Sequence, residues 1–136
     1  MTLERRDVPE LHPTAGYAHV TVADGRFAFL AGQCPVAADG SLVGEGDLAA
    51  QVAQIVANCL TALGAAGAGP EDVVRTTIYV ASDHRDDLPR VWDLLRASPL
   101  AAAFSTASTL LGVTALGYTG QLVEVDVTAV LPHDGP

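Results

Sequence analysis

The order of apolar patterns along this 136-residue chain constrains its fold more than any other feature. Apolar side chains recur at helical spacing on one stripe from Leu48 to Leu63, and Asp47 stands where it can cap the first turn. Val73–Val80 follows as a β-branched run typical of a strand. A second helical stripe spans Leu88–Leu95. The alternation predicts an α/β (α+β) fold, with a mixed sheet and two helices packed on one face.

Strand patterns also stand at both ends of the chain. Ala18–Val22 and Arg26–Ala31 flank Asp24-Gly25, which predicts a hairpin. Ser105–Val113 and Gln121–Val130 are the last two expected strands. With one short strand allowed before the first helix, the expected order is β-β-(β)-α-β-α-β-β.

The sheet face away from the helices would stay open in a monomer. The pattern assigns Leu30 and Ile78 to that face, which would give it apolar area. Exposed apolar sheet faces mark interfaces. We therefore expect an oligomer, whose number of subunits the pattern leaves open.

The length predicts a single domain over residues 1–136, with an N-terminal arm at 1–14 and a loose tail at 132–136. The first ten residues contain no apolar segment of the kind found in secretory signals, and no apolar run approaches the ~18 residues of a membrane span. A cytoplasmic protein without a membrane partner is expected.

Charge and cysteine content restrict the partners. The net charge is −9, from 16 acidic and 7 basic residues, and there is no lysine. Phosphate backbones need clustered cations, so no nucleic-acid partner is expected. Cys34 and Cys59 form no metal-binding spacing, so neither a metal site nor a disulfide is expected.

Six stretches, taken in order, resemble the YjgF/RidA family of reactive intermediate deaminases, which includes proteins described as L-PSP endoribonucleases. The resemblance covers about residues 15 to 131. Its parts are Tyr17, FLAGQCPV at 29–36, the turn at Gly40, QVAQIVANCLTALGAAG at 51–67, DVVRTTIYVASD at 72–83 and LVEVDVTAV at 122–130.

This resemblance implies a chorismate-mutase-like fold and a homotrimer, in which three sheets enclose a central barrel-like core. One cleft lies between each pair of subunits. Deaminating members hydrolyse enamines and imines to a ketone or keto acid plus ammonia, without a metal or an organic cofactor. An arginine in a Pro-Ala-Arg stretch binds the substrate carboxylate in those members.

The resemblance also implies site residues. Glu124 matches the glutamate that positions water. Tyr17 matches a pocket tyrosine, and the alternative for Tyr17 is a side chain that packs at a subunit interface. Gly32 and Gln33 match the Gly-Gln turn, and Ala31 replaces its usual serine. From the strand pattern alone, Glu124 would be a solvated carboxylate.

Two further positions depart from the family pattern, and a third lies beside the Gly-Gln turn. Ser108 stands where the arginine belongs, and no arginine lies nearby in sequence. Trp92 stands where many members carry an asparagine, and it suits either the core or a narrowed pocket. Cys34 follows the Gly-Gln turn and could line the cleft; a small buried side chain is the simpler interpretation of it than a catalytic thiol.

The resemblance therefore implies a cofactor-independent enzyme, acting by hydrolytic deamination or proton transfer on an imine, enamine or related carbonyl compound. The missing arginine argues against a standard 2-aminoacrylate deaminase. The alternative is a non-catalytic trimer that binds a small molecule or regulates a partner, and a ribonuclease role is disfavoured by the acidic charge.

Overall fold

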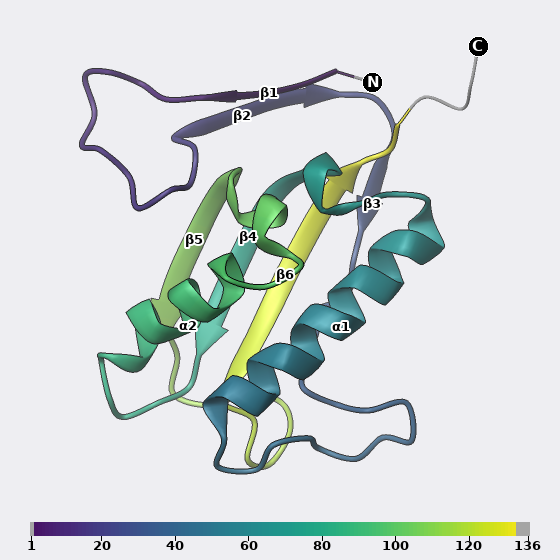
Figure 1. Cartoon of the computed structure of the whole chain (residues 1–136), viewed down its shortest axis with the longest axis vertical. Coiled ribbons are helices and arrows are strands. Elements are labelled where there is room, and N and C mark those ends of the chain that lie inside the picture. The colour runs from purple at the N-terminus through teal and green to yellow at the C-terminus, as the bar shows by residue number, and fades with distance from the viewer. Residues whose placement is uncertain (1, 133–136) are drawn as a thin grey trace.

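Two helices lie across one face of a four-stranded sheet in the computed structural model, which describes residues 2–132 (Figure 1). The helices are α1 and α2, and two short 3-10 turns, η1 and η2, precede strands. The elements are β1 (Thr2–Arg6), β2 (Val20–Asp24), β3 (Phe27–Phe29), α1 (Leu48–Ala66), η1 (Pro70–Asp72), β4 (Val73–Val80), α2 (Asp87–Arg96), η2 (Ala101–Phe104), β5 (Ala107–Gly112) and β6 (Val123–Val130).

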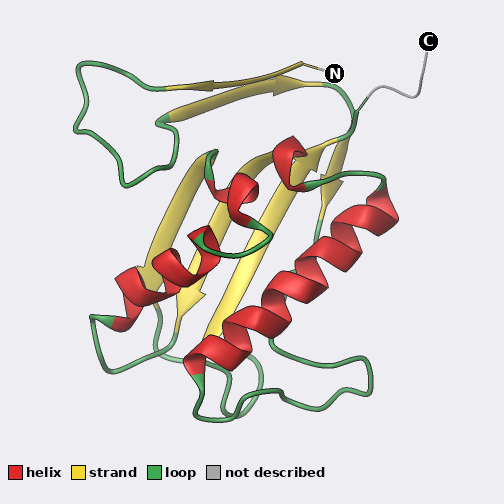
Figure 2. Cartoon of the chain, viewed as in Figure 1, coloured by secondary structure: helices red, strands yellow, loops and turns green. Residues whose placement is uncertain are grey.

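The four-stranded sheet has the order β3-β6-β4-β5. β4 and β5 run parallel, because α2 crosses over between them, whereas β6 runs antiparallel to both β3 and β4. Figure 2 shows both helices on the same side of these strands. The predicted mixed sheet with two helices on one face is therefore confirmed, as are the bounds of β4.

Alternation along β6 separates a buried face from a partly exposed one. Val123, Val125 and Val127 are buried beneath the helices, while Glu124 and Asp126 point to the other side.

The assignment of Leu30 and Ile78 to the open face is wrong. Ile78 pairs with Val125 and is fully buried on the helix face, and Leu30 packs against the same core. Alternation distinguishes two faces of a strand but does not say which one the helices cover. The side chains of β4 on the open face belong to Arg75, Thr77 and Tyr79, so that face is largely polar there.

The predicted hairpin between residues 18–22 and 26–31 is also wrong. β2 pairs with β1 in a separate two-stranded sheet, with Thr2 opposite Asp24, and β3 pairs with β6. Part of the expected N-terminal arm is thus a strand. Of the expected tail, residues 133–136 lie outside the described part of the chain.

Local capping signals set the helix ends. The Asp47 carboxylate accepts a hydrogen bond from the amide of Ala50 at 3.1 Å, as predicted. Gly67 ends α1 with a φ of +82°, a conformation that glycine adopts without strain. Asp87 is the first residue of α2, and its carboxylate accepts a hydrogen bond from the Ser82 hydroxyl at 2.6 Å.

Helix α1 has 19 residues and a mean hydropathy of 1.4, enough by length and composition alone to cross a membrane. This corrects the expectation that no segment approaches that length. The helix contributes Ile55, Cys59 and Leu63 to the core, each fully buried against the sheet. These contacts are those of a core helix, and burial raises the pKa of the Cys59 thiol to about 12.

Candidate functional site

The Glu124 carboxylate lies against the Gly32 turn on the open face of the sheet. Its Oε2 atom occupies the space that a Cβ at position 32 would need. Any residue other than glycine would displace the carboxylate. Gly32 and Gln33 are fixed in turn, because Gln33 exchanges two backbone hydrogen bonds with Val125, at 2.8 and 3.1 Å.

The other oxygen of Glu124 accepts two hydrogen bonds. The Cys34 thiol donates to Oε1 at 3.1 Å, and the Gln121 side-chain amide donates to the same atom at 3.2 Å. Gln121 is nearly fully buried and is held at both ends, because its amide also donates to the Val123 carbonyl and its carbonyl accepts from the Tyr118 amide. These donors fix the direction of the carboxylate.

Burial, followed by the hydrogen bond to Glu124, raises the pKa of the Cys34 thiol to about 11. A thiol with this pKa is protonated at neutral pH and is a poor nucleophile. Cys34 therefore acts here as a hydrogen-bond donor, a role that differs from both a simple buried side chain and a catalytic thiol.

Helix α1 anchors the loop that carries Cys34. The Asn58 side-chain amide donates to the carbonyls of Cys34 and Val36, both at 3.0 Å. The Gln33 side chain caps the Ala31 carbonyl at 2.8 Å, and the side chain of Ala31 is exposed. Residues 31–34 are thus held between β6 and α1 and form one edge of the carboxylate site.

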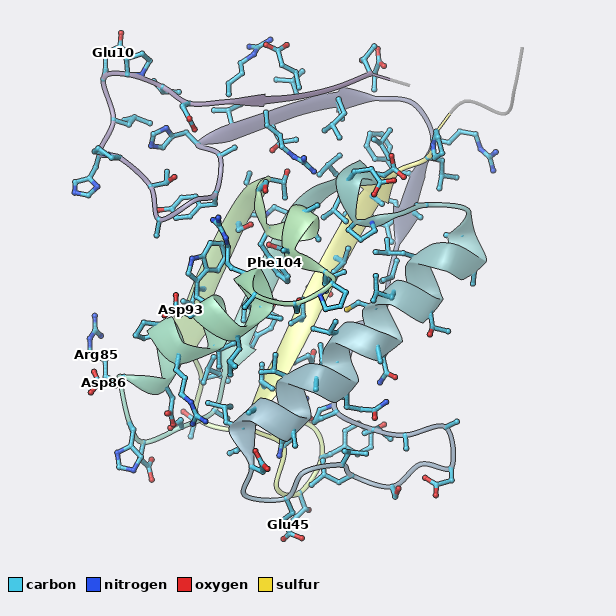
Figure 3. All side chains as sticks on the ribbon, in the orientation of Figure 1. Glu10, Glu45, Arg85, Asp86, Asp93 and Phe104 are labelled. Atoms are coloured by element: carbon cyan, nitrogen blue, oxygen red, sulfur yellow. The ribbon has the colours of Figure 1, made fainter. Side chains whose placement is uncertain are left out.

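A second cluster lies between α2 and β5. Trp92 packs edge-to-face against both Tyr17 and Phe104, with ring centroids 5.9 and 6.0 Å apart. Its indole N–H donates to the Ala15 carbonyl at 3.1 Å. Phe104 lies between α2 and the strands (Figure 3), so Trp92 joins the core to the loop that carries Tyr17.

Ser108 belongs to this second cluster. Its hydroxyl lies 2.6 Å from the Thr76 hydroxyl and 3.0 Å from the Thr106 carbonyl. Because Ser108 pairs with Thr76 in the parallel register, its side chain points to the helix face of the sheet. There it lines a cavity together with Tyr17 and Trp92.

This cavity has a volume of about 500 Å³. Its walls are largely apolar, and two charged side chains stand at one end. The lining residues are Ala15, Tyr17, Arg85, Asp86, Leu88, Pro89, Trp92, Ser108 and Leu110. Arg85 and Asp86 lie at the start of α2 with exposed side chains that point outward (Figure 3). A cavity of this size and composition suits a small organic ligand.

The predicted site residues therefore form two clusters in one chain. Gly32, Gln33 and Cys34 surround Glu124, whereas Tyr17, Trp92 and Ser108 line the cavity. Glu124 pairs with Tyr79, and Ser108 pairs with Thr76, so the two side chains point to opposite faces of the sheet. One chain does not bring them into a common crevice.

Further polar groups surround the carboxylate cluster on the open face. The Tyr79 hydroxyl lies 3.5 Å from the Asp126 carboxylate, and desolvation together with that negative charge raises the pKa of Tyr79. Arg75 donates to the Thr109 hydroxyl at 2.7 Å. Across residues 2–132 no three His, Cys, Asp or Glu side chains are grouped so that they could hold a metal ion.

Several residues at these clusters were not predicted from the sequence. Gln121 begins an expected strand, and nothing in its neighbours signals a contact with Glu124. Arg85, Asp86 and Leu110 reach the cavity only through the packing of α2 beside β5. Leu88 was expected on the apolar stripe of α2, and the cavity lining is consistent with that stripe.

Comparison with known proteins places this chain in a family. The family described as endoribonuclease L-PSP matches residues 8–131. A RutC family protein from Synechocystis is 32% identical over 123 residues, which cover 88% of this chain and 89% of that protein. A RutC family protein from Pyrococcus abyssi is 36% identical over 56 residues, which cover 41% of this chain and only 44% of the relative.

Solved structures agree. A crystal structure of a Rid family protein of unknown function, YyfB from Yersinia pestis, superposes with a TM-score of 0.85 and 32% identity, covering 96% of this chain and all of the other. Rv2704 from Mycobacterium tuberculosis, a member of the YjgF/YER057c/UK114 family, has a TM-score of 0.62 and 25% identity, with coverages of 96% and 100%.

Proposed function

Since the chain belongs to the YjgF/RidA (endoribonuclease L-PSP) family and has its chorismate-mutase-like fold, we propose that it is a cofactor-independent hydrolase acting on an imine, an enamine or a related carbonyl compound. Glu124 is the proposed catalytic residue. Tyr17, Trp92 and Ser108 are proposed to line the substrate pocket, and residues 31–34 to form the wall beside the carboxylate.

The contact between Glu124 and Gly32 is the observation that carries this proposal. A carboxylate that is merely solvated has no fixed position. This one fills the space beside a residue without a side chain and accepts two hydrogen bonds on Oε1. Such fixed geometry suits a group that must hold a water molecule in one direction.

In the proposed reaction, Glu124 accepts a proton from water while the water oxygen bonds to the carbon of the C=N group. The proton passes to nitrogen, so the first product is a neutral carbinolamine. Its C–N bond then breaks with a second proton transfer to nitrogen, which leaves a carbonyl compound and ammonia. The sum is imine plus water giving ketone plus ammonia, and no redox change occurs.

The two clusters would meet between subunits. Because Glu124 and Ser108 point to opposite faces of one sheet, a complete cleft needs the carboxylate cluster of one chain and the cavity of a second. Exposed apolar side chains on β2 and β3 offer a surface for such an assembly: Val20, Val22, Phe27 and Phe29 are 38%, 45%, 40% and 78% exposed. A homotrimer with a central barrel-like core is the proposed assembly.

The substrate is proposed to differ from 2-aminoacrylate and its imine. Ser108 has no charge with which to bind a carboxylate, and a carboxylate–guanidinium contact contributes about 1.5–3 kcal/mol, or about 10–150-fold in affinity. A larger substrate with an uncharged group at this position fits the apolar cavity better.

The experiment measures hydrolysis of a panel of imines, formed in situ by amino-acid or amine oxidases, with purified full-length protein. Glu124→Gln should lower kcat by about 100-fold or more, as expected when a general base is lost. Asp126→Asn is the matched control, because Asp126 stands two residues away on the same face without a contact to Gly32. Equal rates for wild type and Glu124→Gln on every imine would overturn the proposal.

A non-catalytic binding trimer is the second candidate, and the loss of the family arginine at Ser108 favours it. It predicts ligand binding at the cavity without turnover of any imine. Saturable binding together with an imine half-life unchanged by the protein would replace the first proposal by the second.

A further inference from the structure

The hydrogen bonds of the Ser108 hydroxyl leave it with only one free bonding position. Its single proton is donated to the Thr106 carbonyl at 3.0 Å, because a carbonyl oxygen can only accept. The contact of 2.6 Å with Thr76 must then use the proton of Thr76. One lone pair of Ser108 is thereby filled, and one remains.

Thr76 holds this arrangement in place. It is fully buried and pairs directly with Ser108 across β4 and β5, so its hydroxyl cannot turn to solvent. The free position of Ser108 is therefore an acceptor. It can receive an N–H or O–H group, but it cannot donate to a carboxylate.

Besides Ser108, the side chains at the cavity that can donate a hydrogen bond belong to Tyr17, Trp92 and Arg85. The Trp92 indole N–H is already donated to the Ala15 carbonyl. Leu88, Pro89 and Leu110 supply apolar walls. Arg85 is exposed at the outer end and is followed by Asp86, so that end presents charges of both signs.

We propose that the cavity beside Ser108 binds an apolar group that carries a hydrogen-bond donor, such as a primary amide or a hydroxyl, and disfavours a carboxylate of the same shape. The inference rests on the proposed function in one respect: the cavity is taken as the part of the cleft that holds the substrate body. It needs no catalysis to be tested.

Phenylacetamide and phenylacetate form a matched pair of probes, because they share size and shape and differ in one donor group and one charge. Trp92 is the single tryptophan of the chain and lines the cavity. Its indole N–H resonance in the full-length protein therefore reports binding at this place. We expect phenylacetamide to bind at least about tenfold more tightly than phenylacetate. The Ser108 hydroxyl can only accept here, so a carboxylate beside it would have no hydrogen-bond donor.

Two variants separate recognition from general packing. Ser108→Arg should reverse the preference in favour of phenylacetate. Ser108→Ala removes the hydroxyl that accepts, so the ratio of the two affinities should fall toward one. If Ser108 only filled space, Ser108→Ala would change both affinities equally and leave the ratio unchanged.

The inference is overturned if wild type binds phenylacetate as tightly as phenylacetamide, or if neither probe shifts the Trp92 resonance. Amide selectivity without imine hydrolysis would remove the proposed function and leave this inference standing. Imine hydrolysis without amide selectivity would do the reverse.

Discussion

The Sγ atom of Cys34 lies 3.1 Å from Oε1 of Glu124, so the thiol of one segment donates a hydrogen bond to the carboxylate of another. Residues 34 and 124 are far apart in sequence and meet because Gln33 pairs with Val125. The contact links the loop after the Gly-Gln turn to the proposed catalytic strand.

This contact predicts that Glu124→Gln makes Cys34 more reactive. In wild type the pKa of the Cys34 thiol is raised to about 11, first by burial and then by Glu124. Removing the negative charge removes part of the cause, so the pKa should fall, while burial keeps it above the ordinary value of 9.0. The rate of iodoacetamide alkylation between pH 8 and 11 measures it.

Cys59 provides the internal reference for that measurement, because it is fully buried and its pKa of about 12 has burial as its cause. Asp126→Asn is the control for a lost charge on the same strand. An alkylation profile of Cys34 that is the same in Glu124→Gln and wild type would show that the thiol does not donate to Glu124.

Much of this fold follows from local signals. The stripe of α1, its cap at Asp47 and the bounds of β4 were all predicted, because each depends on neighbouring residues. The pairing of β2 was not, because Asp24-Gly25 is a strong hairpin signal and the real partner, β1, lies about twenty residues earlier in the chain. Strand pairing over that distance depends on tertiary contacts that local patterns do not contain.

The site could be predicted only in part for the same reason. The Gly-Gln turn and Glu124 are visible as a family pattern, and the structure brings them together. Gln121 and Arg85 gave no signal in the sequence. Gln121 reaches Glu124 only through the path of the loop before β6, and Arg85 reaches the cavity only because the start of α2 packs beside it. The separation of Ser108 from Glu124 follows from strand register, which sequence alone did not supply for β5.

Gly32→Ala should displace the Glu124 carboxylate while leaving the cavity intact. A Cβ would overlap Oε2, the far end of a flexible side chain, so the carboxylate would turn away and lose its hydrogen bonds to Cys34 and Gln121. We expect a lower free energy of unfolding in urea, loss of any imine hydrolysis, and unchanged shifts of the Trp92 resonance by phenylacetamide.

Gly64→Ala is the matched control for Gly32→Ala. Gly64 is a helical residue, and a Cβ there would meet nothing within 4 Å. Alanine in a helix interior is favoured over glycine by roughly 1 kcal/mol, so this variant should be more stable than wild type. A Gly32→Ala variant as stable and as active as wild type would show that the position of the carboxylate beside residue 32 does not matter.

Gln51 joins α1 to two loops, and Gln51→Leu should be strongly destabilising. Its buried amide donates to the carbonyls of Gly44 and Gly120 at 3.1 and 3.0 Å, and its carbonyl accepts from the Leu122 amide at 2.8 Å. The Gly44 carbonyl would keep the Asp47 amide as a donor, whereas the Gly120 carbonyl and the Leu122 amide would lose these partners, at about 1–3 kcal/mol for each that stays buried.

Urea denaturation at one fixed protein concentration measures this effect, with Gln54→Leu as the control. Gln54 lies on the same helix, is only partly buried, and donates to the Asn58 side chain. We expect Gln54→Leu to change the free energy of unfolding by less than about 1 kcal/mol. Equal losses in both variants would mean that the Gln51 contacts add nothing specific.

Mixed oligomers test whether the two clusters act across subunits. Ser108→Trp fills the cavity and Glu124→Gln removes the carboxylate, so each homo-oligomer should be inactive on an imine that wild type hydrolyses. If each cleft takes its cavity from one chain and Glu124 from another, random mixing in equal amounts leaves about one quarter of the clefts with both parts intact. The mixture should then recover about one quarter of the wild-type rate. If a single chain carried the whole site, no mixture of the two variants would contain an intact one, and the rate after co-refolding would stay at zero.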